Sequence, residues 1–401
     1  MRRSVWWIRP LLAVPAIVTA AVVVAAFTGG PVSVVDGPAD PEQVLRGRQL
    51  VLEHACSLCH GSFDPGQEGW VAGMMRPDQE FLIGPFRTRP RNLTPDNVTG
   101  IGRFSERQIF NALRYGLRPG ETADVEITAT TPGEGNFPIN PKYLAPPMPW
   151  PAWRHMSDQD LWAIAAYLKH GVAPVSHKVE DSEGPPDFWA SAYTPEEIGT
   201  LPAAAFPTAH ETEPPAGVDR AQVLRGRQVA IQHDCGGCHG GATNPAADGW
   251  LAGITDSSGA FPAAACGPDA GGKPCLWMRP RNLTPDDATG TGRYTDRQIF
   301  NALRYGLRPS NATDVEIAAD RSNFPMEPDY LGLGMPWVAW RHMPDQDLWA
   351  LVAYLKHGLR PVTNEVEASD APPDRWASEY TVEKIGPYPA TPFPTTYEVK
   401  P

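Results

Sequence analysis

Most of this chain is one sequence unit that occurs twice, and this duplication constrains the fold more than any other feature. The matching segments include 44–49 with 223–228, 89–96 with 279–286, and 108–119 with 298–309. The period of roughly 190 residues is far longer than the repeats of a solenoid, so it predicts two homologous domains in tandem. We place these domains at residues 36–214 and 215–401. The join at residues 208–217 is rich in proline and polar residues and is typical of a linker.

Each copy contains three stretches with the spacing and end signals of α-helices. In the first copy they cover about residues 41–55, a segment that begins at Ser105, and residues 157–170. Ser105 with Gln108 forms a capping-box pattern, which the second copy repeats. The chain has 45 prolines and 37 glycines among its 401 residues, which favours short helices joined by long irregular loops. We therefore predict a mainly α fold.

The N-terminal segment has the pattern of a membrane anchor. Three arginines precede an uncharged apolar run at residues 10–27, which is long enough, with its flanking tryptophans, for one membrane span. Residues 1–30 are therefore predicted to be an anchor, and a cleaved signal peptide is the alternative. By the positive-inside rule, the rest of the chain lies on the periplasmic side of the inner membrane.

Each copy carries one Cys-x-x-Cys-His motif. The two motifs are Cys56-Ser-Leu-Cys59-His60 and Cys235-Gly-Gly-Cys238-His239. This is the haem c attachment pattern, in which the thiols form two thioethers and the adjacent imidazole binds the iron. A redox dithiol would require a strand–helix context, and a four-thiolate zinc site would require both pairs to share one ion. The sequence therefore predicts two covalently bound haem c groups.

The second axial ligand of each iron must lie downstream of the cysteines. Met148 and Met335 occupy equivalent Met-Pro-Trp segments, and a thioether is a soft, neutral ligand that raises the haem potential. His155 and His342 are the alternatives and would give bis-histidine ligation. His54, Met156 and their second-copy equivalents His233 and Met343 are further candidates. The predicted iron ligands are His60 with Met148, and His239 with Met335.

Arginines near both sites are candidates for binding haem propionates. Arg91 and Arg281 lie in the shared Arg-Pro-Arg-Asn-Leu segment, while Arg154 and Arg341 follow the methionines. A guanidinium binds a carboxylate through two parallel hydrogen bonds, so the residue type suits this role. Ordinary surface charge is the alternative interpretation. We include Arg91 and Arg281 among the predicted cofactor-binding residues.

Two cysteines remain after haem attachment. Cys266 and Cys275 lie in an insertion that only the second copy contains, in a segment rich in glycine and proline. Because we expect this segment to lie outside the cytoplasm, we predict a local disulfide between them.

Together these motifs resemble class I c-type cytochromes, and in particular the cytochrome subunits of membrane-bound alcohol and gluconate dehydrogenases. The resemblance also rests on segments 84–87, 92–96, 99–102, 148–150, 158–161 and 166–168, and it covers about 130 residues of each copy. It implies that Gly47 packs against Tyr167, and Gly226 against Tyr354. Those subunits usually carry three haems, whereas this chain has two motifs, and their membrane attachment is usually at the other end.

A six-coordinate iron has no open position for a substrate, so the sites favour electron transfer over catalysis. We expect a membrane-anchored dihaem cytochrome c that passes single electrons from a membrane oxidoreductase to a soluble cytochrome or a terminal oxidase. An electron-transfer subunit of a membrane-bound dehydrogenase is one alternative, and a dihaem enzyme of the peroxidase or thiosulfate dehydrogenase type is another. The net charge of −12 argues against nucleic acid as a partner, whereas the anchor implies contact with membrane lipid.

Overall fold

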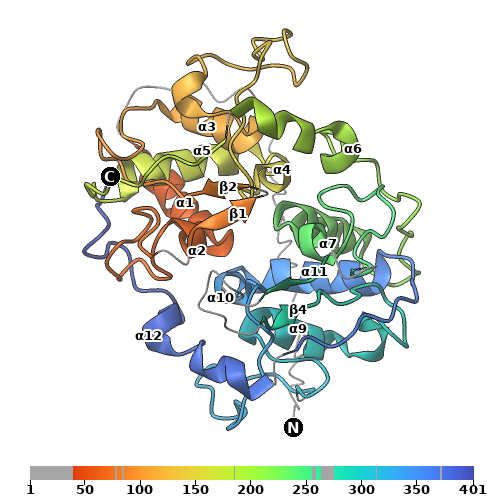
Figure 1. The fold of residues 1–401 in the computed structure, drawn as a ribbon. Coiled ribbons are helices and arrows are strands. Elements are labelled where there is room, and N and C mark those ends of the chain that lie inside the picture. The colour runs from red at the N-terminus through yellow and green to blue at the C-terminus, as the bar shows by residue number, and fades with distance from the viewer. Residues whose placement is uncertain are drawn as a thin grey trace, which may run out of the picture. The chain divides into compact units, whose positions relative to one another are not determined.

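The computed structural model describes residues 39–76, 79–83, 85–184, 186–254, 259–262, 275–312, 314–370 and 373–401. These residues are mainly helical, as predicted, with two small pieces of sheet (Figure 1). The predicted anchor at residues 1–30 lies outside the described residues. Within the part that is described, none of the helices combines the length and the apolar character that crossing a membrane requires. The residues that follow Gly37 form one compact unit.

The first copy contains the following elements in chain order: α1 Pro41–Glu53, α2 Cys56–His60, β1 Phe81–Ile83, β2 Phe86–Thr88, α3 Glu106–Tyr115, η2 Pro119–Glu121, α4 Trp150–Trp153, α5 Asp158–Ala166, η3 Tyr167–Gly171, η4 Pro186–Ala192 and α6 Pro195–Ile198. Strands β1 and β2 are antiparallel, with Phe81 opposite Thr88. Segment η3 continues α5 as a π-helical turn.

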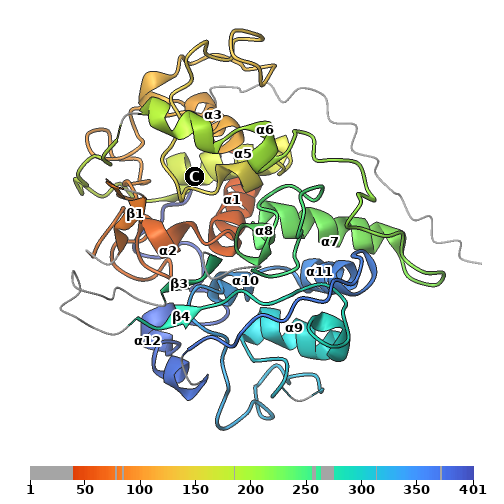
Figure 2. The same cartoon turned by 45° about the vertical axis from the view of Figure 1, so that its right-hand side comes forward.

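The second copy repeats this order: α7 Arg220–Gln232, α8 Cys235–His239, β3 Phe261–Pro262, β4 Trp277–Met278, η7 Thr291–Arg293, α9 Asp296–Tyr305, α10 Trp337–Trp340, α11 Asp345–His357, η8 Pro373–Ser378 and α12 Val382–Ile385. Helix α8 and strand β3 are labelled in Figure 2. Strands β3 and β4 are antiparallel, like β1 and β2. The three predicted helices are present in each copy, and the structure adds shorter ones around the cysteines and after the methionines.

The predicted helix starts are confirmed by their caps. The Ser105 side chain accepts a hydrogen bond from the backbone N–H of Gln108, whose own side chain accepts one from the backbone of Ser105. The same reciprocal pair occurs at the start of α9. Asp40 and Ser157 cap α1 and α5 in the ordinary one-sided way. Local sequence therefore determines where these helices begin.

A close helix crossing forms the centre of each copy, where α1 packs on α5 and α7 packs on α11 (Figures 1 and 2). A Cβ atom added at Gly47 would lie 1.9 Å from the Ala163 carbonyl oxygen and 2.7 Å from Cβ of Tyr167. At Gly226 the corresponding distances, to the Ala350 oxygen and Cβ of Tyr354, are 1.8 Å and 2.8 Å. The predicted glycine–tyrosine packing is confirmed in both copies.

The segment that follows each copy packs into the other copy. Glu398, near the C-terminus, accepts a hydrogen bond of 2.5 Å from the Tyr167 hydroxyl and pairs with Arg48 at 2.6 Å. Equivalent contacts join Glu211, in the predicted linker, to Tyr354 and Arg227 of the second copy. Both views accordingly place the C-terminus beside α1 and α5 (Figures 1 and 2). The chain end thus completes the first copy as the linker completes the second.

Candidate functional site

The cysteine motifs form single helical turns, α2 and α8, that follow a residue with left-handed backbone geometry. That residue is Ala55, at φ 60°, before α2, and Asp234, at φ 54°, before α8. The four cysteines are free thiols. Burial raises the pKa of Cys56 to about 12 and that of Cys59 to about 11, and the second pair has the same values. The first cysteine of each motif is buried, whereas Cys59 is partly buried and Cys238 is exposed. Thiols with raised pKa values suit thioether formation better than a reactive dithiol or a thiolate zinc site, both of which need the thiolate.

The motif histidines are held in one tautomer by a backbone carbonyl. Nδ1 of His60 lies 2.6 Å from the carbonyl oxygen of Arg91, and Nδ1 of His239 lies 2.6 Å from that of Arg281. Because a carbonyl only accepts, each Nδ1 carries the proton and each Nε2 is left with a lone pair. Burial also lowers the pKa of both imidazoles, which keeps them neutral. A neutral, oriented Nε2 is what an axial ligand of haem iron requires.

The methionine segments have the same conformation in both copies. The backbone N–H of Trp150 donates to the Met148 carbonyl at 2.9 Å, and Trp337 donates to Met335 at 2.9 Å. Met148 is partly buried against the core cluster that contains Cys56, and Met335 against the cluster that contains Cys235. The structure therefore brings each predicted thioether ligand to the same core as its cysteine motif. This donor set of thiols, imidazole and thioether fits a covalently attached haem.

The rival methionines belong to the same two core clusters as the cysteines, and two of the rival histidines meet at the contact between the copies. Met156 and Met343 are each only 3% exposed and pack within the cores. His54 and His233 stack on each other with ring centroids 4.1 Å apart. The choice of Met148 and Met335 over His155 and His342 stays a prediction. The backbone carbonyl of His155 accepts a hydrogen bond from the Gln228 side chain, and that of His342 accepts one from the Gln49 side chain.

The arginines at the two sites differ in their surroundings. The Arg91 side chain pairs with Asp181. Arg154 is buried and donates at 2.8 Å to the carbonyls of Ile198 and Gly199, and Arg341 does the same for Ile385 and Gly386. These two guanidiniums therefore hold the ends of α6 and α12. A propionate-binding role for Arg91 and Arg281 stays a prediction, although both contribute their carbonyls to the motif histidines.

The structure describes only one of the two cysteines of the predicted disulfide. Cys275 is disulfide-bonded. Cys266, its predicted partner, lies outside the described residues, so the pairing itself stays a prediction.

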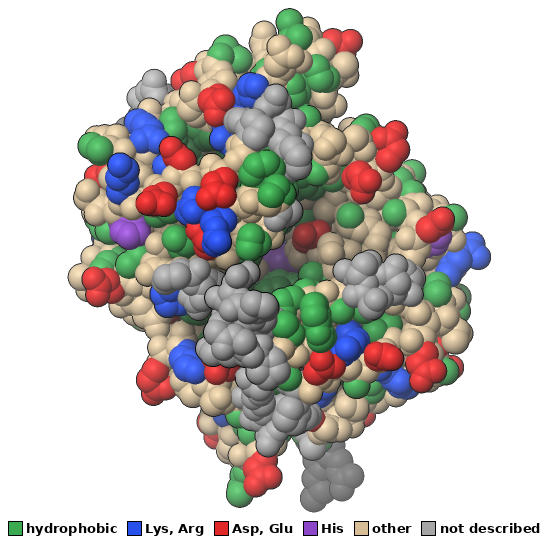
Figure 3. All heavy atoms as spheres, viewed as in Figure 1, with side chains coloured by type: hydrophobic (Ala, Val, Ile, Leu, Met, Phe, Trp, Pro, Cys, Tyr) green, Lys and Arg blue, Asp and Glu red, His purple; other side chains and the backbone are tan. Residues whose placement is uncertain are grey.

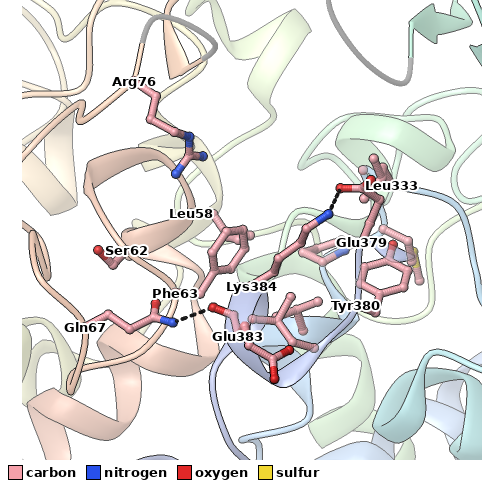
Figure 4. Close-up of a pocket in the computed structure, with 15 residues that line it drawn as sticks. Leu58, Ser62, Phe63, Gln67, Arg76, Leu333, Glu379, Tyr380, Glu383 and Lys384 are labelled. Atoms are coloured by element: carbon pink, nitrogen blue, oxygen red, sulfur yellow. Dashed lines mark hydrogen bonds and ion pairs between the residues drawn. The ribbon is translucent and has the colours of Figure 1, made fainter. Parts of the chain in front are cut away.

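A cavity of about 680 Å³ lies between the two sites (Figure 4). Leu58, from the first cysteine motif, and Met335, the predicted second-copy ligand, both line it. Lys384 and Glu379 form an ion pair of 3.1 Å on its wall. Residues of both sites thus face one shared space.

Glu53 is a buried acid at the contact between the copies, where the second copy has Gln232. Its carboxyl is only 3% exposed. Burial raises its pKa to about 7, and the hydrogen bond from the Gln49 amide offsets only part of this effect. The native state therefore keeps a proton that the unfolded chain loses above pH 4.5, so Glu53 makes the fold less stable as the pH rises from there to about 7.

Changing Glu53 to glutamine is expected to remove this penalty. Above about pH 7 the variant should gain about 3 kcal/mol in free energy of unfolding over the parent, and near pH 4 the two should be nearly equal. Chemical denaturation of the holoprotein at both pH values measures this difference. The exposed Glu68 provides the control, since Glu68→Gln should change neither value. An equal effect of Glu53→Gln at both pH values would contradict the assignment.

Comparison with known proteins agrees with this geometry. Residues 223–358, from α7 to the glycine after α11, match the model of the Cytochrome c family, whose members bind haem c covalently. The chain is 26% identical over 347 residues to the gluconate 2-dehydrogenase cytochrome c subunit of Pantoea cypripedii, covering 84% of this chain and 64% of that protein.

Two further relatives carry similar descriptions. The cytochrome c subunit of the quinone alcohol dehydrogenase of Gluconacetobacter polyoxogenes is 27% identical over 331 residues, which cover 81% of this chain and 57% of that subunit. The fructose dehydrogenase cytochrome subunit of Gluconobacter japonicus is 22% identical over 333 residues, which cover 78% and 52%. The chain therefore spans between half and two thirds of the length of these relatives.

Proposed function

We propose that this protein is a dihaem electron-transfer subunit of a membrane-bound dehydrogenase. The observation that carries the proposal is that both copies present the same donor set: two thiols on one helical turn, an imidazole held through Nδ1, and a methionine on the same core. The relatives add that proteins of this kind are cytochrome subunits of dehydrogenases. They favour the subunit over the independent membrane-anchored carrier that the sequence alone predicts.

In this proposal the haem supplies reversible one-electron chemistry, and the chain controls its surroundings. The cysteine thiols fix the group to α2 and α8. His60 and His239 present Nε2 while the carbonyls of Arg91 and Arg281 prevent the rings from turning. Met148 and Met335 would hold the group through their thioethers, which would keep water and substrates from binding to it. An electron can then enter or leave with little movement of the protein.

The partners and the location follow from the same proposal. Electrons would arrive from a dehydrogenase and leave to a soluble cytochrome or a terminal oxidase, with residues 1–30 holding the domains at the membrane. The net charge of −12 favours partners with a basic docking surface. On the face shown in Figure 3, acidic side chains are spread among basic ones. Complementary charge should therefore affect the rate of encounter, which high salt would reduce.

Changing either predicted methionine ligand to leucine tests the ligand set. Met148→Leu and Met335→Leu should each remove about half of the methionine-to-iron charge-transfer absorbance and lower the potential of one haem, because the thioether favours the reduced state. Optical redox titration of the holoprotein measures both effects, after haem content has been determined chemically.

Met156→Leu is the matched control, since Met156 is a buried methionine of the same copy, and it should leave the band intact. A full band in both ligand variants would transfer the assignment to Met156 and Met343, whereas a parent protein without the band would transfer it to His155 and His342. A chain that binds one haem or none would refute the dihaem proposal itself.

A further inference from the structure

Four aromatic rings form a continuous ladder across the contact between the two copies. His54 and His233 stack at its centre, with ring centroids 4.1 Å apart and planes inclined by 3°. Trp153 lies edge-on to His54 at 6.3 Å, and Trp340 lies edge-on to His233 at 6.3 Å. Each copy thus contributes one histidine and one tryptophan at equivalent positions. We call these four residues the aromatic ladder.

In each copy, both residues of the aromatic ladder lie close in sequence to a proposed haem site. His54 precedes the first cysteine of its motif by two residues, and His233 does the same in the second copy. Trp153 and Trp340 are the last residues of α4 and α10, the short helices that follow the methionine ligands. On each side, the attachment segment and the methionine segment therefore both lead to the ladder.

Reciprocal hydrogen bonds fix the two copies against each other at this point. The side-chain amide of Gln49 donates to the carbonyl of His342, and the amide of Gln228 donates to that of His155. Gln49 also donates to Glu53 at 3.1 Å, and Gln228 to Gln232 at 3.2 Å. These contacts hold α1 and α7 in place, so the stacking of the histidines is a defined arrangement.

The central rings are buried and uncharged. His54 is 7% exposed, and neither of its ring nitrogens has a hydrogen-bond partner within the described residues. Burial, and the neighbouring His233 and Arg46, lower the pKa of His54 well below its usual value, and burial lowers that of His233 to about 3. Asp347 raises the latter and Arg225 lowers it, but neither restores the charge. Two neutral rings can therefore stay in contact without electrostatic repulsion.

The same residues are less well arranged to bind a metal ion than to stack their rings. Ligand atoms of Glu53, His54 and His233 lie within 4.8 Å of one another, which is close enough to consider one. The lone pair of an imidazole nitrogen lies in the plane of its ring, and the planes here are nearly parallel. Lone pairs in parallel planes do not converge on a single ion, whereas parallel faces give good orbital overlap between the rings.

We propose that the aromatic ladder is the route by which electrons pass between the two haem sites. The inference rests on the proposed function, because it requires a haem at each cysteine motif. With haem held at both motifs, one electron would pass from the site of Cys56 and Cys59 to the site of Cys235 and Cys238, or the reverse. No bond forms or breaks, and no proton leaves either imidazole. Electron tunnelling weakens steeply with each gap through space, and the ladder offers ring-to-ring steps of 6.3, 4.1 and 6.3 Å between centroids.

The test measures electron transfer within one molecule of the full-length holoprotein. A Met335→His background gives the second haem a different spectrum and a lower potential. After a short pulse of reductant, absorbance then follows the electron from the second haem to the first, at a rate independent of protein concentration. Haem content and the distinct spectrum are checked first. If the protein lacks two haems or the distinct spectrum, the proposed function fails. The rate of electron transfer between the haems tests the aromatic ladder alone.

His54→Ala with His233→Ala should slow this step by at least an order of magnitude. His54→Phe with His233→Phe keeps two stacked rings and should retain the rate to within a factor of two. His170→Ala is the control and should have no effect on this rate. It removes a histidine of η3 that pairs with Glu106. An unchanged rate in the alanine variant, or an equal loss in the phenylalanine variant, would overturn the proposal. If the double alanine variant fails to take up haem, His233→Ala alone decides by the same criteria.

Discussion

Changing Gly47 to alanine is expected to destabilise the first copy by about 3 kcal/mol or more and to prevent stable haem attachment there. In an open helix this substitution stabilises by up to about 1 kcal/mol, because alanine is the better helix former. Here the new methyl group would lie 1.9 Å from a backbone oxygen of α5, so the two helices must move apart. Chemical denaturation and haem content per chain measure the effect.

The second copy and an open glycine provide the controls. Gly226→Ala should have an equally large effect on the second domain, since its added methyl group would lie 1.8 Å from the Ala350 oxygen. Gly120→Ala should change little, because its Cβ would approach nothing closer than 3.6 Å. A stable, fully loaded Gly47→Ala protein would show that the helices do not cross as described.

Changing Glu398 to alanine is expected to lower the stability of the first domain by about 3–5 kcal/mol, although Glu398 lies almost at the end of the chain. Its carboxylate is fully buried and binds both Arg48 and Tyr167. Without it the Arg48 guanidinium, only 11% exposed, would keep its desolvation cost and lose its partner. Hydrogen exchange should show the loss in α1 and α5.

Glu211→Ala is the matched variant, and its loss should appear in α7 and α11, because Glu211 has the same partners in the second copy. Glu134→Ala, at an exposed position of the first copy, should leave the free energy of unfolding unchanged. If Glu398→Ala weakened only the second domain, the C-terminal segment would have to pack with its own copy.

The features that sequence predicts well here depend on local chemistry. The capping residues Ser105 and Gln108 act over three positions, and their pattern leads directly to the helix start. The Cys-x-x-Cys-His motifs are equally local. The Gly47–Tyr167 crossing was also predicted, although it rests on resemblance to a family and not on spacing.

The features that sequence analysis missed depend on contacts between distant segments. Nothing local in Arg91 indicates that its carbonyl, and not only its side chain, lies at the site. The stacking of His54 on His233 depends on how the copies meet, which no pattern within one copy records. The roles of Glu211 and Glu398 had a signal, because Phe206-Pro-Thr with Glu211 recurs as Phe393-Pro-Thr with Glu398. That repeat shows that the segments of Glu211 and Glu398 are equivalent, but it does not show which copy each segment packs against.

The exchange of segments between the copies determines how this protein can be divided. A fragment that contains only the first copy would keep the segment of Glu211, which packs on the second copy, and would lack the segment of Glu398, which packs on the first. A circular permutant that opens the chain just before residue 203, omits residues 1–38 and joins residue 401 to residue 39 should fold better than either isolated half. A bulky tag fused after Pro401 should therefore disturb α1 and the end of α5, which the C-terminal segment contacts through Glu398.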